Sequence, residues 1–161
     1  MKTKKAILFV VLLALIITLP SCAMSNEKRQ LFAVATGDEI DLHIDKKSDF
    51  VIEFDAPYLI TKNGETYLEG GFADANTFDQ LRTIVSYDTD TSVIDEYEKD
   101  GNKYFIFESR KEDAGTEYFT TILIAESNTC ATLISSKTRE DTLEAVNALT
   151  FTLRPAAPFK T

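Results

Sequence analysis

The chain has 161 residues, of which 44% are hydrophobic and 27% are charged, and its formal net charge is −9. This length fits one ordinary domain built around a single core. The acidic balance excludes the basic face that nucleic-acid binding requires, so we predict no nucleic-acid partner.

The first 21 residues are typical of an export signal. Lys2, Lys4 and Lys5 form a basic start, and an apolar run follows over residues 6–19. As a helix, this run would reach about 21 Å, which is short of the ~30 Å hydrocarbon core of a bilayer. We therefore interpret residues 1–21 as a cleaved signal peptide.

The leader ends in Leu19-Pro20-Ser21-Cys22. This sequence resembles the lipobox of bacterial lipoproteins, although proline stands where a small residue is commoner. The resemblance implies that a diacylglyceryl group is attached to Cys22 and that a signal peptidase cuts between Ser21 and Cys22. A second acyl chain would make the attachment lasting. The alternatives are an ordinary secreted protein, or an uncleaved anchor, in which Cys22 is incidental.

Cleavage would leave a strongly acidic chain. Residues 1–21 contain three lysines and no acid, so the remainder has 14 basic and 26 acidic side chains and a net charge of −12. Anionic lipid headgroups do not attract such a chain, so the lipid on Cys22 is the predicted membrane attachment. This places the protein on the extracytoplasmic face of the cell membrane, where a protein partner in the envelope is expected. Cys130 lies in an apolar run and is predicted to be a buried free thiol.

The chain after the leader divides into three parts. We predict a tether over residues 22–37, a single domain over residues 38–154 and a tail over residues 155–161. Alternating apolar residues predict strands at residues 39–45, 50–54, 58–62, 65–69, 92–98, 103–109, 116–126, 129–135 and 151–153. Asn63-Gly64 predicts a type I′ hairpin within this set.

Two segments have helical rather than strand-like spacing. They are residues 76–85 and residues 138–149. Asn76 or Thr77 is the expected N-cap of the first. Thr138 and Asp141 have capping-box spacing at the start of the second.

The order of these elements predicts the α+β class, with an antiparallel meander sheet flanked by helices. The apolar strands and the acidic-capped helix between Lys103 and Leu153 resemble the PsbP-like fold, which also occurs in several bacterial lipoproteins. The resemblance implies an α/β/α sandwich over residues 50–153. It implies no particular activity, because this fold supports unrelated binding roles.

Motifs for catalysis are missing from the sequence. His43 is the single histidine and is predicted to be an exposed structural residue, because it lies on the polar side of an alternating strand. The chain contains no G-x-S-x-G, H-E-x-x-H, paired C-x-x-C or glycine-rich phosphate loop. We predict no catalytic residue, no cofactor and no metal.

One acidic segment has a spacing similar to that of a calcium-binding loop. Asp88 and Asp90 stand at alternate positions as in an EF-hand loop, but Val93 and Lys99 replace the required glycine and glutamate. This excludes an EF-hand. A solvated acidic loop is the preferred interpretation, and an irregular cation site that also uses Asp95 is the alternative.

These observations predict a lipid-anchored extracytoplasmic lipoprotein with a non-catalytic binding or accessory role in a membrane-associated assembly. The alternatives are a carboxylate-dependent hydrolase of unrecognised type and a purely structural envelope component. Converging carboxylates with strongly shifted pKa values would favour the hydrolase. An exposed apolar patch would favour the binding module.

Overall fold

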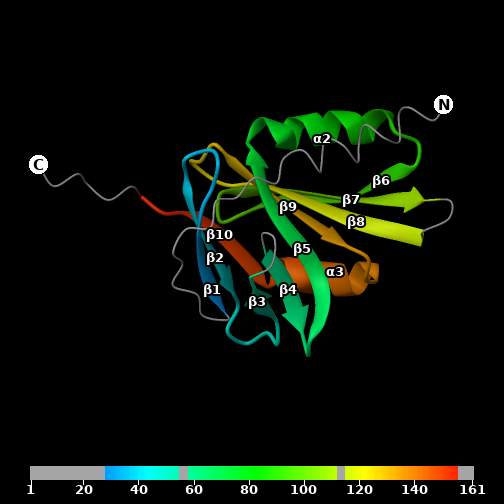
Figure 1. Ribbon diagram of the computed structural model, residues 1–161. Helices are drawn as coiled ribbons and strands as arrows, with labels where there is room; N and C mark the ends of the chain where they lie inside the picture. The colour runs from blue at the N-terminus through cyan, green and yellow to red at the C-terminus, as the bar shows by residue number, and fades with distance from the viewer. Residues whose placement is uncertain (1–27, 55–57, 112–114, 156–161) are drawn as a thin grey trace, which may run out of the picture.

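The computed structural model describes residues 28–54, 58–111 and 115–155 (Figure 1). Of these residues, 56% lie in strands and 17% in helices. The protein is therefore β-rich, and its strands form two antiparallel sheets.

The smaller sheet has three strands in the order β1-β2-β10. They are β1 (Arg29–Ala33), β2 (Glu39–Ile44) and β10 (Leu149–Leu153). The central strand β2 pairs with β1 on one side and with β10 on the other. Strands from the two ends of the described chain are thus neighbours.

The larger sheet has seven strands in the order β3-β4-β5-β9-β8-β7-β6. They are β3 (Val51–Glu53), β4 (Tyr58–Lys62), β5 (Glu65–Asp74), β6 (Thr91–Lys99), β7 (Asn102–Lys111), β8 (Gly115–Leu123) and β9 (Thr129–Ser135). The last four strands form the predicted meander. Strand β5 pairs with β9 and so connects this meander to β4 and β3.

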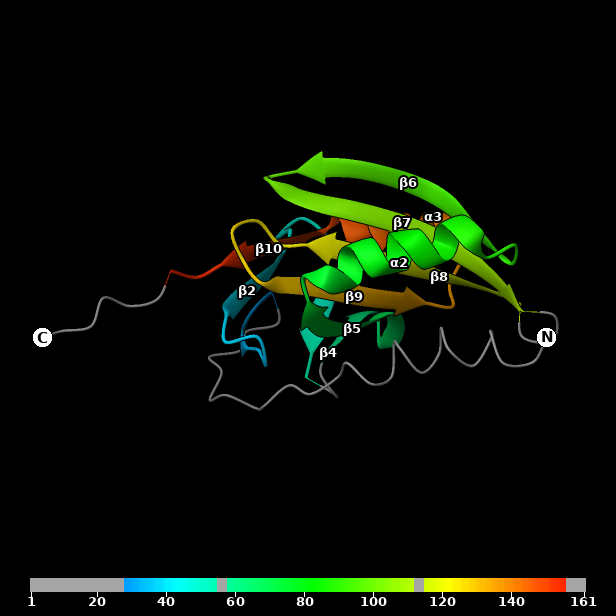
Figure 2. The same cartoon turned by 90° about the horizontal axis from the view of Figure 1, so that it is seen from above.

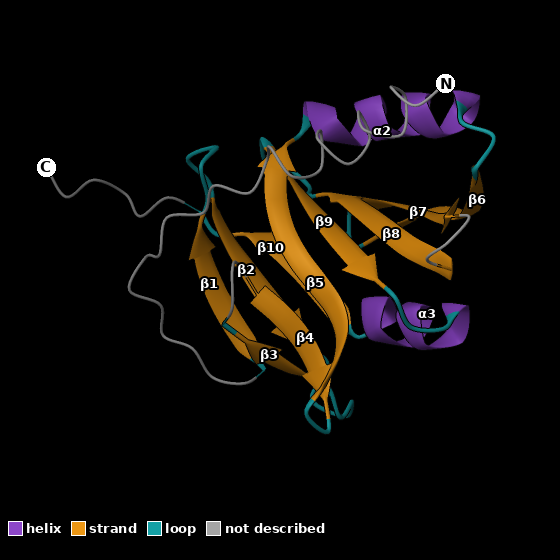
Figure 3. Ribbon diagram, turned by 45° about the vertical axis from the view of Figure 1, so that its right-hand side comes forward, coloured by secondary structure: helices purple, strands orange, loops and turns teal. Residues whose placement is uncertain are grey.

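The predicted fold class, an α+β PsbP-like α/β/α sandwich with one sheet flanked by helices, is wrong. The described chain is mostly β and contains two helices, α2 (Asn76–Tyr87) and α3 (Arg139–Asn147). The second sheet causes the difference, because β1, β2 and β10 pair with one another instead of extending the large sheet. Figure 3 shows the small sheet beside β3, β4 and β5.

Two tight turns set the register of neighbouring strands. Asn63 and Gly64 have φ values of 56° and 78°, so the predicted type I′ hairpin between β4 and β5 is confirmed. Asp100 and Gly101 have φ values of 54° and 80° and join β6 to β7 in the same way. Both turns place a glycine where φ is positive, a conformation that glycine adopts without steric cost.

The main core fills the space between the two sheets and α3. Alternate residues of β2 (Ile40, Leu42 and Ile44) point into it and are at most 3% exposed. Ala145 and Val146 of α3 close the same core. Burial of the isoleucine, leucine and valine side chains stabilises the domain, each by on the order of 1.5–3 kcal/mol.

Helix α2 covers the opposite face of the β7–β9 region (Figure 2). Phe78 and Val85 pack there against Phe105, Phe107 and Phe119. The rings of Phe107 and Phe119 are stacked, with centroids 5.1 Å apart. Strand β8 is therefore covered on both faces, as its two apolar sets predict.

The helix starts differ in how well the sequence predicts them. Thr138 caps α3 as predicted, because its Oγ1 accepts from the Asp141 N–H at 3.2 Å. The N-cap of α2 is Ala75 rather than the expected Asn76 or Thr77. The carboxylate of Asp74 instead accepts from the Asn76 N–H at 2.9 Å.

The folded region begins earlier than the sequence indicates. Strand β1 lies inside the segment 22–37 that we expected to be a tether, and it pairs with β2 over five residues. Lys28 lies next to it and donates from Nζ to the carbonyl of Ser48 at 2.7 Å and to that of Phe50. Neither helix of the described chain has the length and apolar character needed to cross a bilayer.

Candidate functional site: a polar clamp and an open sheet edge

The predicted lipidation site lies outside the described residues. Cys22 and Ser21 precede residue 28, where the described structure begins. Lipidation and cleavage there stay predictions. The structure does place the start of β1 only seven positions after Cys22.

Cys130 is a buried free thiol, as predicted. It is 0% exposed on β9, and its sulfur lies 3.6 Å from the carbonyl oxygen of Ala131. Burial raises the pKa of this thiol above its ordinary value. Because the thiolate is the reactive form, Cys130 is a packing residue.

The acidic residues of the Asp88–Asp95 segment bind backbone groups. One carboxylate oxygen of Asp88 accepts from the Asp90 N–H at 2.9 Å. A carboxylate oxygen of Asp95 accepts from the Glu96 N–H at the same distance. Within residues 28–54, 58–111 and 115–155, no group of three metal-ligating side chains is close enough to hold an ion.

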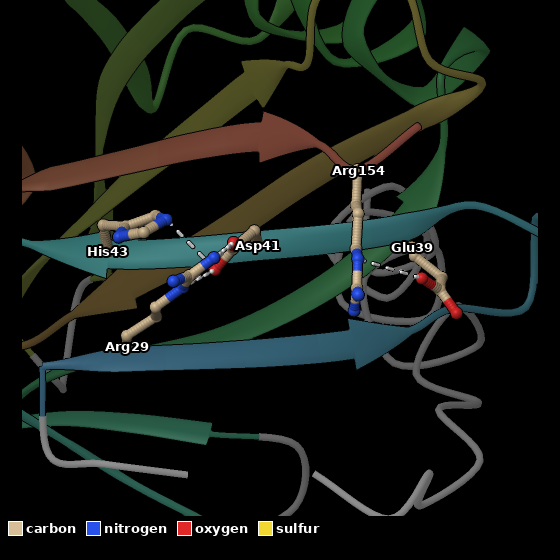
Figure 4. A network of polar contacts seen from close by, with 5 residues as sticks. All are labelled: Arg29, Glu39, Asp41, His43 and Arg154. Atoms are coloured by element: carbon tan, nitrogen blue, oxygen red, sulfur yellow. Dashed lines mark hydrogen bonds and ion pairs between the residues drawn. The ribbon is translucent and has the colours of Figure 1, made fainter. Parts of the chain in front are cut away.

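His43 belongs to a polar clamp on the outer face of the small sheet, formed by Arg29, Asp41 and His43 (Figure 4). Arg29 on β1 stands opposite His43 on β2. The Arg29 Nε donates to the two Asp41 oxygens at 3.0 and 3.1 Å, and the His43 Nε2 lies 3.1 Å from Asp41 Oδ1. Asp41 is 6% exposed and is thus enclosed by its two partners.

The clamp keeps Asp41 ionised. Burial alone would raise its pKa, but the hydrogen bond from Arg29 and the charges of His43 and Arg29 outweigh burial, so the pKa of Asp41 lies below its ordinary value. A general acid requires the opposite shift. We therefore interpret the clamp as a tie between β1 and β2, which agrees with the predicted structural role of His43.

We expect Asp41→Asn to destabilise the domain by about 1–3 kcal/mol at neutral pH, because the charged hydrogen bonds to Arg29 are lost. A lowered pKa in the folded state means that the carboxylate stabilises the fold above its unfolded pKa of about 4 and ceases to do so as the pH falls through the folded pKa. The difference between wild type and variant should therefore shrink below about pH 4. Denaturant unfolding across this pH range measures it.

The matched control for this prediction is Glu39→Gln on the same strand. Glu39 pairs with Arg154 at 3.8 Å, and both side chains are more than half exposed. Exposed pairs of this kind contribute little, so this substitution should change stability by less than about 0.5 kcal/mol. Equal losses in the two variants at neutral pH would contradict the clamp.

No family model, curated protein or solved structure matches the chain.

The large sheet ends on one side in the edge strand β6. Strand β6 is paired with β7 on one side, and it ends the strand order on the other. Ser92, Val93, Asp95, Glu96 and Glu98 are exposed along its nine residues. A long exposed edge offers unpaired N–H and C=O groups to another chain.

Contacts on both faces hold β6 in place. On the α2 side, Arg82 forms an ion pair with Glu96 at 2.9 Å. On the α3 side, the ring of Tyr97 stacks on that of Tyr104, with centroids 4.7 Å apart and planes 7° apart. Lys99 Nζ also donates to the carbonyl of Asn147 in α3 at 3.3 Å. The edge is thus a fixed surface of the fold.

Exposed apolar side chains also occur near the start of this strand. Among the described residues, the exposed large apolar side chains are Phe54, Tyr87 and Val93, at 60%, 85% and 54%. Tyr87 ends α2, and Val93 lies six positions further along the chain in β6. Isolated apolar positions in a charged segment give no period, so the sequence pattern does not predict that these two side chains are exposed.

Proposed function

We propose that this chain is a lipid-anchored extracytoplasmic lipoprotein of a bacterial cell membrane, which serves as a binding or accessory module of a membrane-associated assembly. The observation that carries the proposal is the sequence Leu19-Pro20-Ser21-Cys22 after a basic and apolar leader. The lipid on Cys22 attaches the module to the membrane, and the fold presents a binding surface.

The position of β1 supports a module held close to the bilayer. Six residue spacings separate Cys22 from Lys28, and a chain of that length spans at most about 22 Å in any conformation. The folded domain would therefore begin within this distance of the lipid. An anchored protein with so short a connection can reach partners that lie at or near the membrane surface.

The open edge of β6 supports binding as the role of the domain. Strand addition at a sheet edge supplies affinity through main-chain hydrogen bonds and requires no cavity. The lowered pKa of Asp41 does not suit this residue to be a general acid, so the polar clamp lends no support to acid–base chemistry.

We expect Cys22→Ala to abolish both fatty-acid labelling and cleavage of the leader when the full chain is expressed with its leader in a bacterium. The reason is that the thioether forms on a sulfur atom, and Cys22 supplies the one sulfur atom of the lipobox. Labelling followed by N-terminal analysis of the mature protein measures both effects. Cys130→Ala is the control, and it should be labelled and cleaved like the wild type.

A second experiment in the same cells tests the binding role. Affinity capture of the wild type from detergent-solubilised envelopes should recover a reproducible partner, and Cys22→Ala should lose it because the domain no longer resides at the membrane. Recovery of no partner would count against the accessory role. Labelling of Cys22→Ala, or a wild-type N-terminus other than residue 22, would contradict the anchor.

A further inference from the structure

The edge strand β6 is the longest free edge among the strands that the structure describes. The other edge of the large sheet, β3, has three residues, and the edges of the small sheet, β1 and β10, have five each. The outward carbonyl of Phe151 in β10 is already occupied, because the side-chain amide of Asn102 donates to it at 2.8 Å. Strand β6 has nine residues and therefore offers the best template for an added strand.

The register identifies the backbone groups that point away from β7. The two-residue turn at Asp100 and Gly101 makes Lys99 and Asn102 a hydrogen-bonded pair, and such pairs then alternate along the strands. The Arg110 N–H donates to the Asp90 carbonyl at 2.9 Å, which fits the same alternation. The N–H and C=O groups of Glu96 and Glu98 consequently face outward.

These two positions differ in availability. The Glu96 N–H is bonded to the carboxylate of Asp95 at 2.9 Å, which protects part of the edge. In the part of the chain that the structure describes, no strand pairs with the outer side of β6, so the Glu98 groups remain open at that edge. A register irregularity between Val93 and Asp95 interrupts the strand, so an added strand would pair along residues 95–99.

The charge of this edge selects the kind of strand that can add to it. Positions 88–100 contain six acidic residues and one lysine. Pairing with β6 of a second copy would place acidic side chains beside acidic side chains, which is unfavourable. Lysine and arginine side chains of another protein would instead face opposite charges.

We propose that β6 binds an extended segment of a partner protein, rich in lysine or arginine, as an added antiparallel strand along residues 95–99. The main chain of the segment pairs with Glu98, and its basic side chains lie beside Glu96 and Glu98, which point to the same face of the strand. This inference rests on the proposed binding role and names the partner class. It does not depend on lipidation of Cys22.

The test uses the full chain, purified in detergent, and a fluorescent seven-residue peptide that alternates lysine with threonine or valine. We expect saturable binding that weakens as salt is raised, because exposed charges are screened. A peptide N-methylated on its pairing edge should bind at least about tenfold more weakly, since it lacks main-chain donors. A peptide with glutamate in place of lysine should bind at least about tenfold more weakly for reasons of charge.

A protein variant tests the same edge from the other side. Glu98→Pro removes the outward N–H, and proline is tolerated on an edge where the N–H makes no ladder bond. We expect an affinity loss of at least about tenfold. Glu98→Gln keeps the N–H and loses one charge, so its affinity should fall only about two- to fourfold. Equal affinity of Glu98→Pro and wild type would overturn the proposal.

If Glu98→Pro fails to fold, amide hydrogen exchange of the wild type tests the same edge without a substitution. The peptide should slow exchange of the Glu98 N–H while exchange on β1 and β3 is unchanged. Protection elsewhere, insensitivity to N-methylation, or self-association of the chain through β6 would overturn the inference. If envelope capture still recovers a partner in that case, the proposed function stands and only the assignment to β6 fails.

Discussion

Gly70→Ala is expected to destabilise the domain by about 3 kcal/mol, because the added methyl group has no room. Gly70 on β5 stands opposite Tyr58 on β4, and an added Cβ would lie 2.1 Å from two carbon atoms of the Tyr58 ring. The ring cannot yield easily, since it is 0% exposed and packs against Phe32 and Phe72 at centroid distances of 5.0 and 5.5 Å. Denaturant unfolding of the purified variant measures the loss.

Two further variants separate this clash from a general effect of substitution on β5. Glu69→Ala changes the exposed neighbour of Gly70 and should cost less than about 0.5 kcal/mol. In a Tyr58→Ala background, Gly70→Ala should cost much less than in the wild type, because the ring is gone and the two losses are coupled. Additive losses would show that the close approach of Gly70 to Tyr58 is not the cause.

Asn102→Ala should cost about 2–4 kcal/mol, because it leaves one buried and one partly buried backbone group without their side-chain partner. Asn102 on β7 is 2% exposed, and its amide donates to the carbonyl of Phe151 on β10 at 2.8 Å. Its side-chain oxygen accepts from the Ala125 N–H, also at 2.8 Å. This one side chain therefore joins the two sheets, and thermal or denaturant unfolding should show the loss clearly.

Asn147→Ala is the matched control for this substitution. Asn147 is exposed at the end of α3, and its side chain accepts a long bond of 3.4 Å from the hydroxyl of Tyr97. We expect a change below about 0.5 kcal/mol. Similar losses at Asn102 and Asn147 would mean that the link between the sheets contributes no more than a surface contact.

Local features were predictable from the sequence because they depend on a few neighbouring residues. The turn at Asn63 and Gly64 needs only the two residues that adopt positive φ most readily, and the start of α3 needs only Thr138 and Asp141. The strands from β6 to β9 were predicted for the same reason, since alternation and short breaks define a meander.

Strand β1 was missed because its pattern is irregular. Phe32 faces the core as a strand residue should, but Gln30 on the same face is polar and 1% exposed. The Gln30 amide donates to the Leu31 carbonyl at 3.2 Å, a contact that no periodicity reveals. A buried polar residue thus made a strand resemble a tether.

The division into two sheets could not be read from local pattern. Strand β2 pairs with β10, and more than a hundred residues separate Leu42 from its partner Phe151. Alternation shows that each segment is a strand but does not identify its neighbour. The predicted single sheet flanked by helices was wrong for this reason.

The polar clamp and the open edge could not be predicted either, because both depend on which strands are neighbours. Alternation places Asp41 and His43 on one face of a strand, but Arg29 joins them only through the β1–β2 register. Similarly, the acidic character of residues 88–100 is visible in the sequence, whereas the position of β6 at an edge follows from the strand order. Sites built across strands require the fold.

The measurement that tests the central claim most directly is the intact mass of the mature protein, extracted from the membranes of a bacterium that expresses the full chain with its leader. We predict a chain that begins at Cys22 and carries the mass of a diacylglyceryl group. A mature chain of unmodified mass, or one that begins at any other residue, would contradict the account of a lipid-anchored module.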